Sequence, residues 1–540
     1  MRFVRHGAVA AMLAMTAASL PALQAQESPK MERVADRQTG EGEGPFRRLV
    51  IRGATLVDGT GAPPRGPVDI VIAGNRIESI SGAGTPGLPL EADREPRDFD
   101  REIDATGMFV LPGFVDVHGH NGDPDKAPNA GYGYRLWLAH GVTTVRGVSL
   151  YFGRDNMSLS DRARSAANTI VAPRLFSYLA LGDGWSGGDV TTPDQARAWV
   201  RWAAAEGHDG VKFFNDPPAI TQAAIEEARR HGLGTVAHLA QGGVAEVNAD
   251  RAGAMGLQGI THFYGHFESL LSDHRIPNYP TDYNMFDEQW RFSQVARLAD
   301  QAVEPGSPEW RAYLERQLER GIFFSPTFNI YSAGRDVMRA RNADWHELYT
   351  LPSLQRFFAP SREHHGSYFW DWTTADEIAW RRFYGAWMRL TNDYKNMGGR
   401  VTVGSDPGYI YQTWGFSYIS ELEMLQEAGF SPLEVIQAAT INGAREIFEP
   451  KGEEPPFGIV RENMLADLVI VPGNPLANLK LLYGTGHMRL NPETQQEERV
   501  GGVRWTIKDG IVYDAKKLLA DVGAMVEKQR TSRKSSTTSQ

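Results

Sequence analysis

The sequence predicts an α/β fold in which a (β/α)8 TIM barrel is joined to a small β-sandwich domain. Eight short apolar runs alternate with helical or looped stretches between residues 114 and 406, and this alternation is typical of a closed barrel of parallel strands. Short β-type runs flank that region on both sides, so they can pair into one small domain. A chain of 540 residues has room for both parts.

The eight apolar runs begin with FVDVHGH and end with RVTVGSD. In chain order they span residues 114–120, 142–148, 173–181, 210–214, 234–240, 259–265, 321–328 and 400–406. Segments such as PDQARAWVRWAAAEG separate them, carry good helix formers and stop at glycine. Because the chemistry of such a barrel takes place at the carboxyl ends of its strands, we expect the functional site at the ends of these runs.

The N-terminal segment predicts export. Arg2 and Arg5 precede an apolar run, residues 8–23, that is too short for a comfortable membrane span, so residues 1–25 are predicted to be a signal peptide. The mature protein is then expected in the periplasm or outside the cell, without a membrane span. The other predicted parts are a flexible lead-in (26–46), a composite β domain (47–107 and 457–519), the hydrolase barrel (108–456) and a mostly disordered tail (520–540).

The amino-acid composition argues against some classes of binding partner. The 56 basic and 66 acidic residues give a formal charge of -10, which argues against nucleic acid or an anionic membrane as a general partner. The chain has no cysteine, so disulfides and thiolate metal sites are excluded. A small-molecule partner is expected, and association into a homo-oligomer is left open.

Potential metal ligands stand at the ends of several of these runs. His118 and His120 are one residue apart on a predicted strand, so both imidazoles point to the same face and can bind one metal ion. Gly119 between them leaves space on the opposite face. The other candidates, each in a later run, are Lys212, His238, His262 and Asp406. A random scatter of such residues would not fall so consistently at one face of a barrel.

Several ordered motifs carry a resemblance to a known family. They are LPGFVDVHGH, GVTTVRGVS, GVKFF, VAHLA, ITHFYG, VGSDPG and ADLVIVPGNP, and they lie within residues 47–519. In this order they resemble the amidohydrolase superfamily. The likeness is greatest to its imidazolonepropionase-like and prolidase-like metal-dependent hydrolases.

The resemblance implies two divalent metal ions, with zinc expected because nitrogen and carboxylate ligands suit it. It assigns His118, His120 and Asp406 to one ion and His238 and His262 to the other. Lys212 would bridge both ions in its N-carboxylated form, because an ammonium group has no lone pair to offer. The ions would lower the pKa of a bridging water toward about 7, and Asp406 would accept its proton and pass it to the leaving amine.

The leading hypothesis is therefore an exported binuclear amidohydrolase that uses a metal-bridging hydroxide to cleave the C–N bond of a dipeptide or an N-acyl amino acid. A lactonase or other ester hydrolase is an alternative, because the same hydroxide would serve it. A deaminase is another, weakened because Gln241 stands where deaminase branches tend to have a glutamate. A non-catalytic binding protein on the same barrel is the alternative from a different class.

Residues beyond the ligands are candidates for substrate binding. Tyr264, His266 and Tyr409 follow predicted ligands closely and could orient a substrate carbonyl or carboxylate. His266 could also compete with His262 for the metal, but His262 ends the apolar run and is preferred. The insertion at residues 330–376 is rich in aromatic side chains and predicts a lid that favours bulky apolar substrates. Alternatively, these aromatic side chains pack the insertion onto the barrel.

Overall fold

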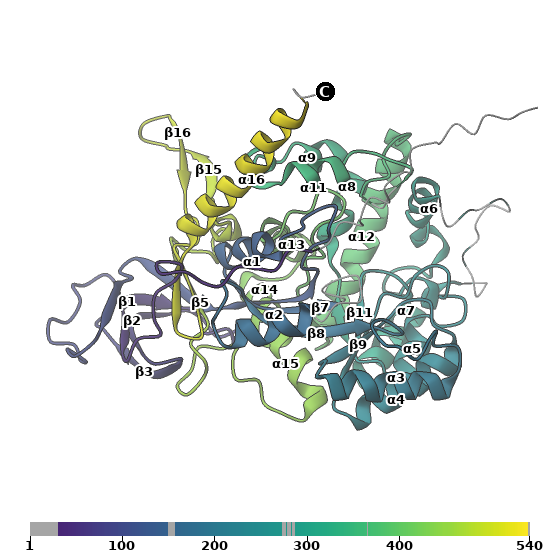
Figure 1. The fold of residues 1–540 in the computed structure, drawn as a ribbon, viewed down its shortest axis with the longest axis horizontal. Coiled ribbons are helices and arrows are strands. Elements are labelled where there is room, and N and C mark those ends of the chain that lie inside the picture. The colour runs from purple at the N-terminus through teal and green to yellow at the C-terminus, as the bar shows by residue number, and fades with distance from the viewer. Residues whose placement is uncertain are drawn as a thin grey trace, which may run out of the picture.

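The structure, a computed structural model, describes residues 31–148, 157–272, 277, 282, 284, 287–363 and 366–537. The predicted signal peptide, residues 1–25, lies outside the described residues, as do His364 and His365 of the aromatic insertion. Figure 1 shows a β-rich part at the left of the molecule, with a larger part of strands and helices to its right. Among the described residues, every helix is too short or too polar to cross a bilayer.

The larger part contains an eight-stranded sheet whose strands pair in the order of the sequence. Its strands are β6 (Phe114–Gly119), β7 (Val142–Val148), β8 (Arg174–Ala180), β9 (Gly210–Phe213), β10 (Gly234–Ala237), β11 (Gly259–Thr261), β12 (Phe323–Ser325) and β13 (Arg400–Val401). Each neighbouring pair is parallel. All eight lie in the predicted runs, so the predicted set of strands is confirmed.

Backbone hydrogen bonds also join the two ends of this sheet. The Val117 N–H in β6 donates to the Val403 carbonyl just beyond β13, over 2.9 Å, and the Asp406 N–H donates to the His118 carbonyl over 2.9 Å. The first strand and the extension of the last strand are therefore neighbours. This arrangement is consistent with a TIM-like barrel.

Helices connect the strands of the sheet. They are α1 (Ala130–Ala139), α2 (Met157–Ala166), α3 (Pro193–Glu206), α4 (Pro218–Arg230), α5 (Ala249–Met255), α6 (Glu288–Val295), α7 (Pro308–Glu319), α8 (Ser332–Arg335), α9 (Val337–Arg341), α10 (His346–Tyr349), α11 (Pro352–Phe357) and α12 (Thr374–Asn396). Helices α13 (Phe416–Glu427), α14 (Pro432–Gln437) and α15 (Gly443–Phe448) follow the last strand. In α3, Thr192 caps the amino end by accepting from the Gln195 N–H, and Gly207 ends the helix at φ 96°.

The smaller sheet is built from both ends of the chain. It contains β1 (Leu49–Leu56), β2 (Arg65–Ala73), β3 (Arg76–Gly82), β4 (Arg101–Asp104), β5 (Met108–Pro112), β14 (Leu468–Pro472), β17 (Trp505–Lys508) and β18 (Ile511–Asp514). The central pairing joins β5 to β14 in antiparallel register. β5 thus belongs to this sheet, although the barrel was predicted to start at residue 108. A separate hairpin consists of β15 (His487–Leu490) and β16 (Glu497–Val500), and the sandwich arrangement stays a prediction.

Two segments that were predicted to be flexible pack onto the molecule. Helix α16 (Ala515–Thr537) covers most of the predicted tail, and Leu518, Val522 and Val526 on one of its faces are buried in the main core. Their spacing of four residues forms the apolar stripe that holds the helix in place. In the lead-in, Val34 is also buried, and the Glu43 N–H donates to the Val512 carbonyl over 2.9 Å. Tertiary packing thus orders segments whose local composition is polar.

Candidate metal centre

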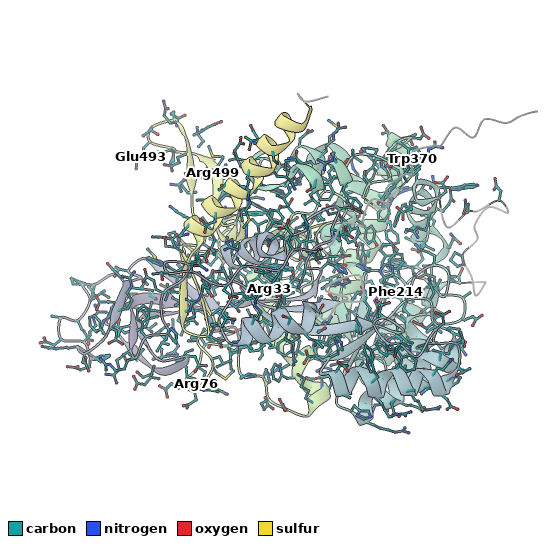
Figure 2. All side chains as sticks on the ribbon, viewed as in Figure 1. Arg33, Arg76, Phe214, Trp370, Glu493 and Arg499 are labelled. Atoms are coloured by element: carbon teal, nitrogen blue, oxygen red, sulfur yellow. The ribbon has the colours of Figure 1, made fainter. Side chains whose placement is uncertain are left out.

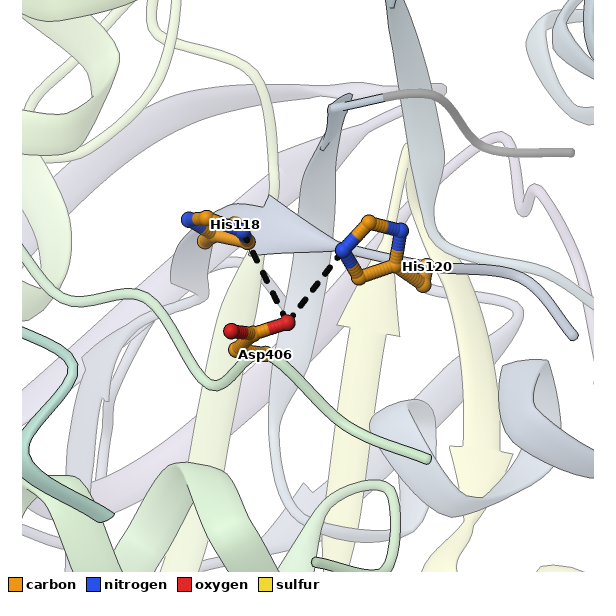
Figure 3. Close-up of side chains that lie close together, drawn as sticks. All are labelled: His118, His120 and Asp406. Atoms are coloured by element: carbon orange, nitrogen blue, oxygen red, sulfur yellow. Dashed lines mark ion pairs between the residues drawn. The ribbon is translucent and has the colours of Figure 1, made fainter. Parts of the chain in front are cut away.

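His118, His120 and Asp406 meet at the carboxyl ends of the first and last barrel strands. One ligand atom of each lies within 4.8 Å of the others, and all three side chains are buried. The Asp406 Oδ1 atom lies 3.6 Å from His118 Nε2 and 3.2 Å from His120 Nε2, and Figure 3 shows both rings turned toward that oxygen. Two imidazole nitrogens and a carboxylate oxygen therefore converge on one small volume.

The backbone explains how these side chains meet. A Cβ atom on Gly119 would lie 2.3 Å from the Val145 side chain, so only glycine lets β6 pack here against β7 while both histidines face the site. Asp406 has φ 43° and His262 has φ 64°, in a region that non-glycine residues seldom occupy. Such strain persists where the surrounding structure enforces it, and it is often found at functional sites.

The later predicted ligands join the same cluster. Lys212 Nζ lies 3.3 Å from His118 Nε2, and His262 Nε2 lies 3.6 Å from Asp406 Oδ2. The His238 ring centre is 4.7 Å from that of His262. All six residues predicted as metal ligands thus lie together at the carboxyl ends of the parallel strands.

Burial favours the neutral form of His118, His120 and His262. It lowers the pKa of His262 to about 3 and that of His118 well below its usual value, because a charged ring would lose its hydration. Burial alone would raise the pKa of Asp406, but the hydrogen bond from the His120 side chain and nearby positive charge bring it down to about 2. Neutral nitrogen donors around an ionised carboxylate are the protonation states that divalent metal ions bind.

Lys212 is buried and forms no ion pair with a carboxylate among the described residues. Burial lowers the pKa of its amine to about 8, although the charge of Asp406 opposes this effect. The ammonium lies 4.8 Å above the centre of the Phe214 ring, a residue labelled in Figure 2. A lower pKa raises the fraction of uncharged amine, which is the form that can take up carbon dioxide.

The donor atoms fit a metal ion. His262 Nδ1 is hydrogen-bonded to the Thr327 hydroxyl, whereas its Nε2 atom is buried and has no hydrogen-bond partner among the described residues. An unpartnered buried nitrogen is costly, so its position beside Asp406 is best explained by an ion that accepts its lone pair. Histidine nitrogens with carboxylate oxygens are a donor set that suits zinc and similar divalent ions.

Asp116 supports the cluster and was missed in the sequence. Its buried carboxylate accepts the His118 N–H over 3.1 Å and the Ser405 N–H over 3.0 Å, which ties the two ligand-bearing loops together. It also accepts the Trp137 indole N–H over 2.9 Å and the Ser405 hydroxyl. A charged residue inside the apolar run FVDVH was the available signal, because buried carboxylates require such partners.

Two predicted substrate residues adjoin the cluster. The Tyr264 ring centre is 4.4 Å from that of His238, and its hydroxyl lies 2.7 Å from the hydroxyl of Tyr331. The Tyr409 ring meets His120 edge-on, with 5.8 Å between ring centres. Both tyrosine rings therefore lie directly beside candidate ligands.

The His266 side chain contacts Tyr313 and Phe324 instead of the candidate ligands. Its Nδ1 atom lies 2.5 Å from the Tyr313 hydroxyl of α7, and its ring centre is 4.3 Å from that of Phe324. Phe324 in turn stacks on Tyr394 of α12, so His266 lies between the barrel wall and the helix layer. These contacts do not support the predicted role of His266 in substrate binding, because a ring behind the strand cannot reach a substrate.

Part of the aromatic insertion packs on the body of the molecule. The Trp345 ring stacks on Phe416 of α13 at 5.0 Å and on Tyr483 at 5.7 Å. Trp370, labelled at the upper right of Figure 2, is half-buried beneath the Arg362 guanidinium. The alternative in which these side chains attach the insertion to the barrel therefore holds for Trp345, whereas Trp370 has a partly free surface.

In comparisons with known proteins, the sequence matches cover only part of the chain, whereas a structural match covers most of it. The chain is 28% identical over 170 residues to an N-acyl-D-aspartate deacylase and 28% identical over 211 residues to an N-acyl-D-glutamate deacylase, both from Alcaligenes xylosoxydans xylosoxydans. These matches cover 30% and 37% of this chain but only 29% and 39% of the relatives, so the chain spans less than half of either.

The structural match extends over most of the chain. A solved structure of a bottromycin amidohydrolase is similar with a TM-score of 0.59 and 20% sequence identity, covering 89% of this chain and 91% of that one. At this level of identity the likeness concerns the fold. No protein-family model matches the chain.

Proposed function

We propose that the chain is a member of the amidohydrolase superfamily and a metal-dependent hydrolase that cleaves an amide bond. The expected substrate is an N-acyl amino acid or a dipeptide. The deacylase names of two relatives support this class, and so does the resemblance of the barrel motifs to prolidase-like hydrolases.

One observation carries the proposal. His118, His120 and Asp406 bring their ligand atoms within 4.8 Å of one another at the carboxyl ends of the barrel strands. Such a cluster is expensive to bury, because burial removes hydration from every donor. We therefore interpret it as a centre that metal binding stabilises and that hydrolysis uses.

We also propose a finer assignment, which the family resemblance implies and which the closeness of the donors supports. We assign His118, His120 and Asp406 to one ion and His238 and His262 to a second, with N-carboxylated Lys212 shared between them. Zinc is the expected metal. When bound, such ions polarise a carbonyl group and lower the pKa of water toward about 7. Export to the periplasm or beyond the cell also belongs to the proposal.

The residues of the chain have separate roles in the reaction. Asp406 is ionised, lies beside the histidines and can accept a proton, which it then returns to the departing amine. Asp116 holds the backbone around His118 and Ser405, and thereby keeps Asp406 in place. Tyr264 and Tyr409 form walls beside the ligands, where they exclude water and orient the substrate.

The test combines metal analysis with a substrate panel. Purified full-length protein should contain about two divalent ions per chain, and a chelator should abolish activity that zinc restores. The panel contains N-acyl amino acids, dipeptides, lactones and amino-heterocycles at equal concentration. The rate of amide cleavage should exceed the rates of lactone opening and of ammonia release. Faster lactone opening would identify an ester hydrolase, and ammonia release from the heterocycles would identify a deaminase.

A matched histidine pair provides the control. His118→Ala should lose both metal and amide hydrolysis, whereas His231→Ala should retain both, because His231 lies exposed at the end of α4. Wild-type turnover in metal-free protein, or unchanged metal content in His118→Ala, would contradict the proposal.

A further inference from the structure

Lys126 lies in the turn after β6, six positions beyond His120, and its side chain is buried instead of pointing to solvent. The residue is 5% exposed. Its ammonium lies 3.7 Å from the centre of the Tyr409 ring and 4.7 Å from the centre of the Phe357 ring. Because Tyr409 also meets the ring of His120, this cation reaches the surroundings of the candidate metal centre.

The turn holds Lys126 firmly. Its N–H donates to the Asp123 carbonyl over 3.1 Å, and its own carbonyl accepts the Ser353 hydroxyl over 2.6 Å. Ser353 belongs to α11, the helix that also provides Phe357. The ammonium is therefore fixed between this helix and the loop that carries Asp406 and Tyr409.

The charge of Lys126 has no close counterpart within the described residues. Among these residues, no carboxylate lies within the 4 Å of its ammonium that defines an ion pair, and the charges of Asp123, Asp406 and Asp125 act on it from farther away. The Asp123 carboxylate is engaged by the Asp125 N–H over 2.9 Å, and Asp125 is exposed. A buried lysine is normally paired, so this cation is costly unless a ligand supplies an anion.

We propose that Lys126 is a specificity-determining residue that binds a carboxylate group of the substrate. The inference rests on the proposed amide hydrolysis and names the residue that would recognise the free carboxylate of its expected substrates, N-acyl amino acids and dipeptides. The aromatic rings beneath the ammonium hold it in a fixed direction and shield it from water, and such shielding strengthens a charge-assisted hydrogen bond.

Loss of the positive charge can be separated from loss of packing. Lys126→Met keeps an unbranched apolar side chain against Tyr409 and Phe357 but removes the ammonium. Lys126→Arg keeps a cation with a different shape. A purely structural lysine would affect all substrates alike, whereas a carboxylate-binding lysine affects only substrates that carry the anion.

The kinetic experiment uses a matched substrate pair with the metal-loaded enzyme. The pair is an N-acyl amino acid that the wild type hydrolyses and the corresponding carboxamide, which lacks the negative charge. Lys126→Met should lower kcat/KM for the carboxylate by roughly 10- to 100-fold, mainly through KM, the value expected for one charge-assisted hydrogen bond. It should leave the carboxamide within about threefold of wild type, and Lys126→Arg should recover part of the loss.

A binding experiment gives a second measurement that does not depend on turnover. N-benzenesulfonylphenylalanine is a carboxylate whose sulfonamide bond is not an amide, and its carboxamide is the uncharged partner. Calorimetry should show that wild-type protein prefers the carboxylate by roughly tenfold or more, and that Lys126→Met loses the preference. Lys395→Met serves as control, because the Lys395 ammonium also lies above an aromatic ring, that of Phe430, but is paired with Glu434.

The outcomes separate the two proposals. Equal losses for both substrates, or no loss for either, would overturn the role of Lys126, and so would equal binding of both probes by the wild type. Carboxylate binding that depends on Lys126, without hydrolysis of any amide, would support the anion site and overturn the proposed reaction instead. Hydrolysis without a carboxylate preference would leave the reaction standing and remove the anion site.

Discussion

Two groups of buried charges lie in the same barrel, and they are built differently. Arg146 of β7 and Glu446 of α15 are almost fully buried and form an ion pair with 2.7 Å between Nη1 and Oε1. Arg146 also donates from Nε to the Val117 carbonyl over 2.8 Å. In contrast, the cluster around Asp406 brings two imidazole nitrogens and one carboxylate oxygen within 4.8 Å of one another and holds Asp406 and His262 at positive φ.

This difference distinguishes a structural ion pair from the proposed metal centre. The charges of Arg146 and Glu446 offset each other inside the protein, so removing one partner should mainly cost stability. The cluster gathers several donors around a single carboxylate, so its stability depends on what it binds. Four variants can sharpen or break this comparison.

The largest effect is expected for Asp406→Asn, which keeps the shape of the side chain but removes its capacity to accept a proton. Turnover should fall by about 10²–10⁴, the usual contribution of a positioned general base. Folding and most of the metal at His238 and His262 should be retained, as measured by thermal melting and metal analysis. Turnover close to wild type would show that another group accepts the proton.

The next effect is expected for Glu446→Gln, which leaves the buried Arg146 charge without its partner. The free energy of unfolding should fall by about 3–5 kcal/mol, measured by denaturant titration. Glu449→Gln is the control, because its pair with Arg400 is exposed and should contribute only about 0–1 kcal/mol. Similar stability of the two variants would mean that the buried pair is not a structural element.

Lys212→Ala should reduce metal content while the fold remains. The expected loss follows from the position of the amine, 3.3 Å from His118 Nε2, where a carbamate would bridge two ions. Propionate in the buffer should restore part of the activity by supplying a carboxylate. Lys516→Ala on an exposed face of α16 should bind metal as the wild type does. Wild-type metal content in Lys212→Ala would remove the bridging lysine from the proposal.

The smallest effect is expected in the aromatic insertion. A Trp370→Ala, Trp372→Ala double variant should lose a preference for bulky aromatic acyl groups over acetyl groups. If the lid buries roughly 40 Å² of apolar substrate surface, the preference is worth about 1 kcal/mol, or about fivefold in kcat/KM. If the ratio of kcat/KM for aromatic-acyl and acetyl substrates were the same in the wild type and the double variant, these rings would only attach the insertion to the barrel, as Trp345 does through Phe416.

Much of the architecture could be predicted because it depends on local patterns. The apolar run before His118 is a strand because its residues are buried on both faces, and the glycine after α3 stops the helix because it adopts a positive φ. The alternation of such runs with helices then leads to the parallel sheet. The convergence of His238 and His262 with Asp406 follows from strand order, because parallel strands end at one edge.

The sequence alone determined the strands, the residues at their ends and the kind of chemistry that these donors allow. Only the tertiary structure decided which way His266 points, where Lys126 finds its aromatic walls and that the polar C-terminal segment forms α16. These features depend on contacts between residues far apart in the chain, such as Ser353 with Lys126 and Asp116 with Ser405. Periodicity reports the face that a residue occupies, whereas the free energy of a buried charge depends on the partners that folding brings to it.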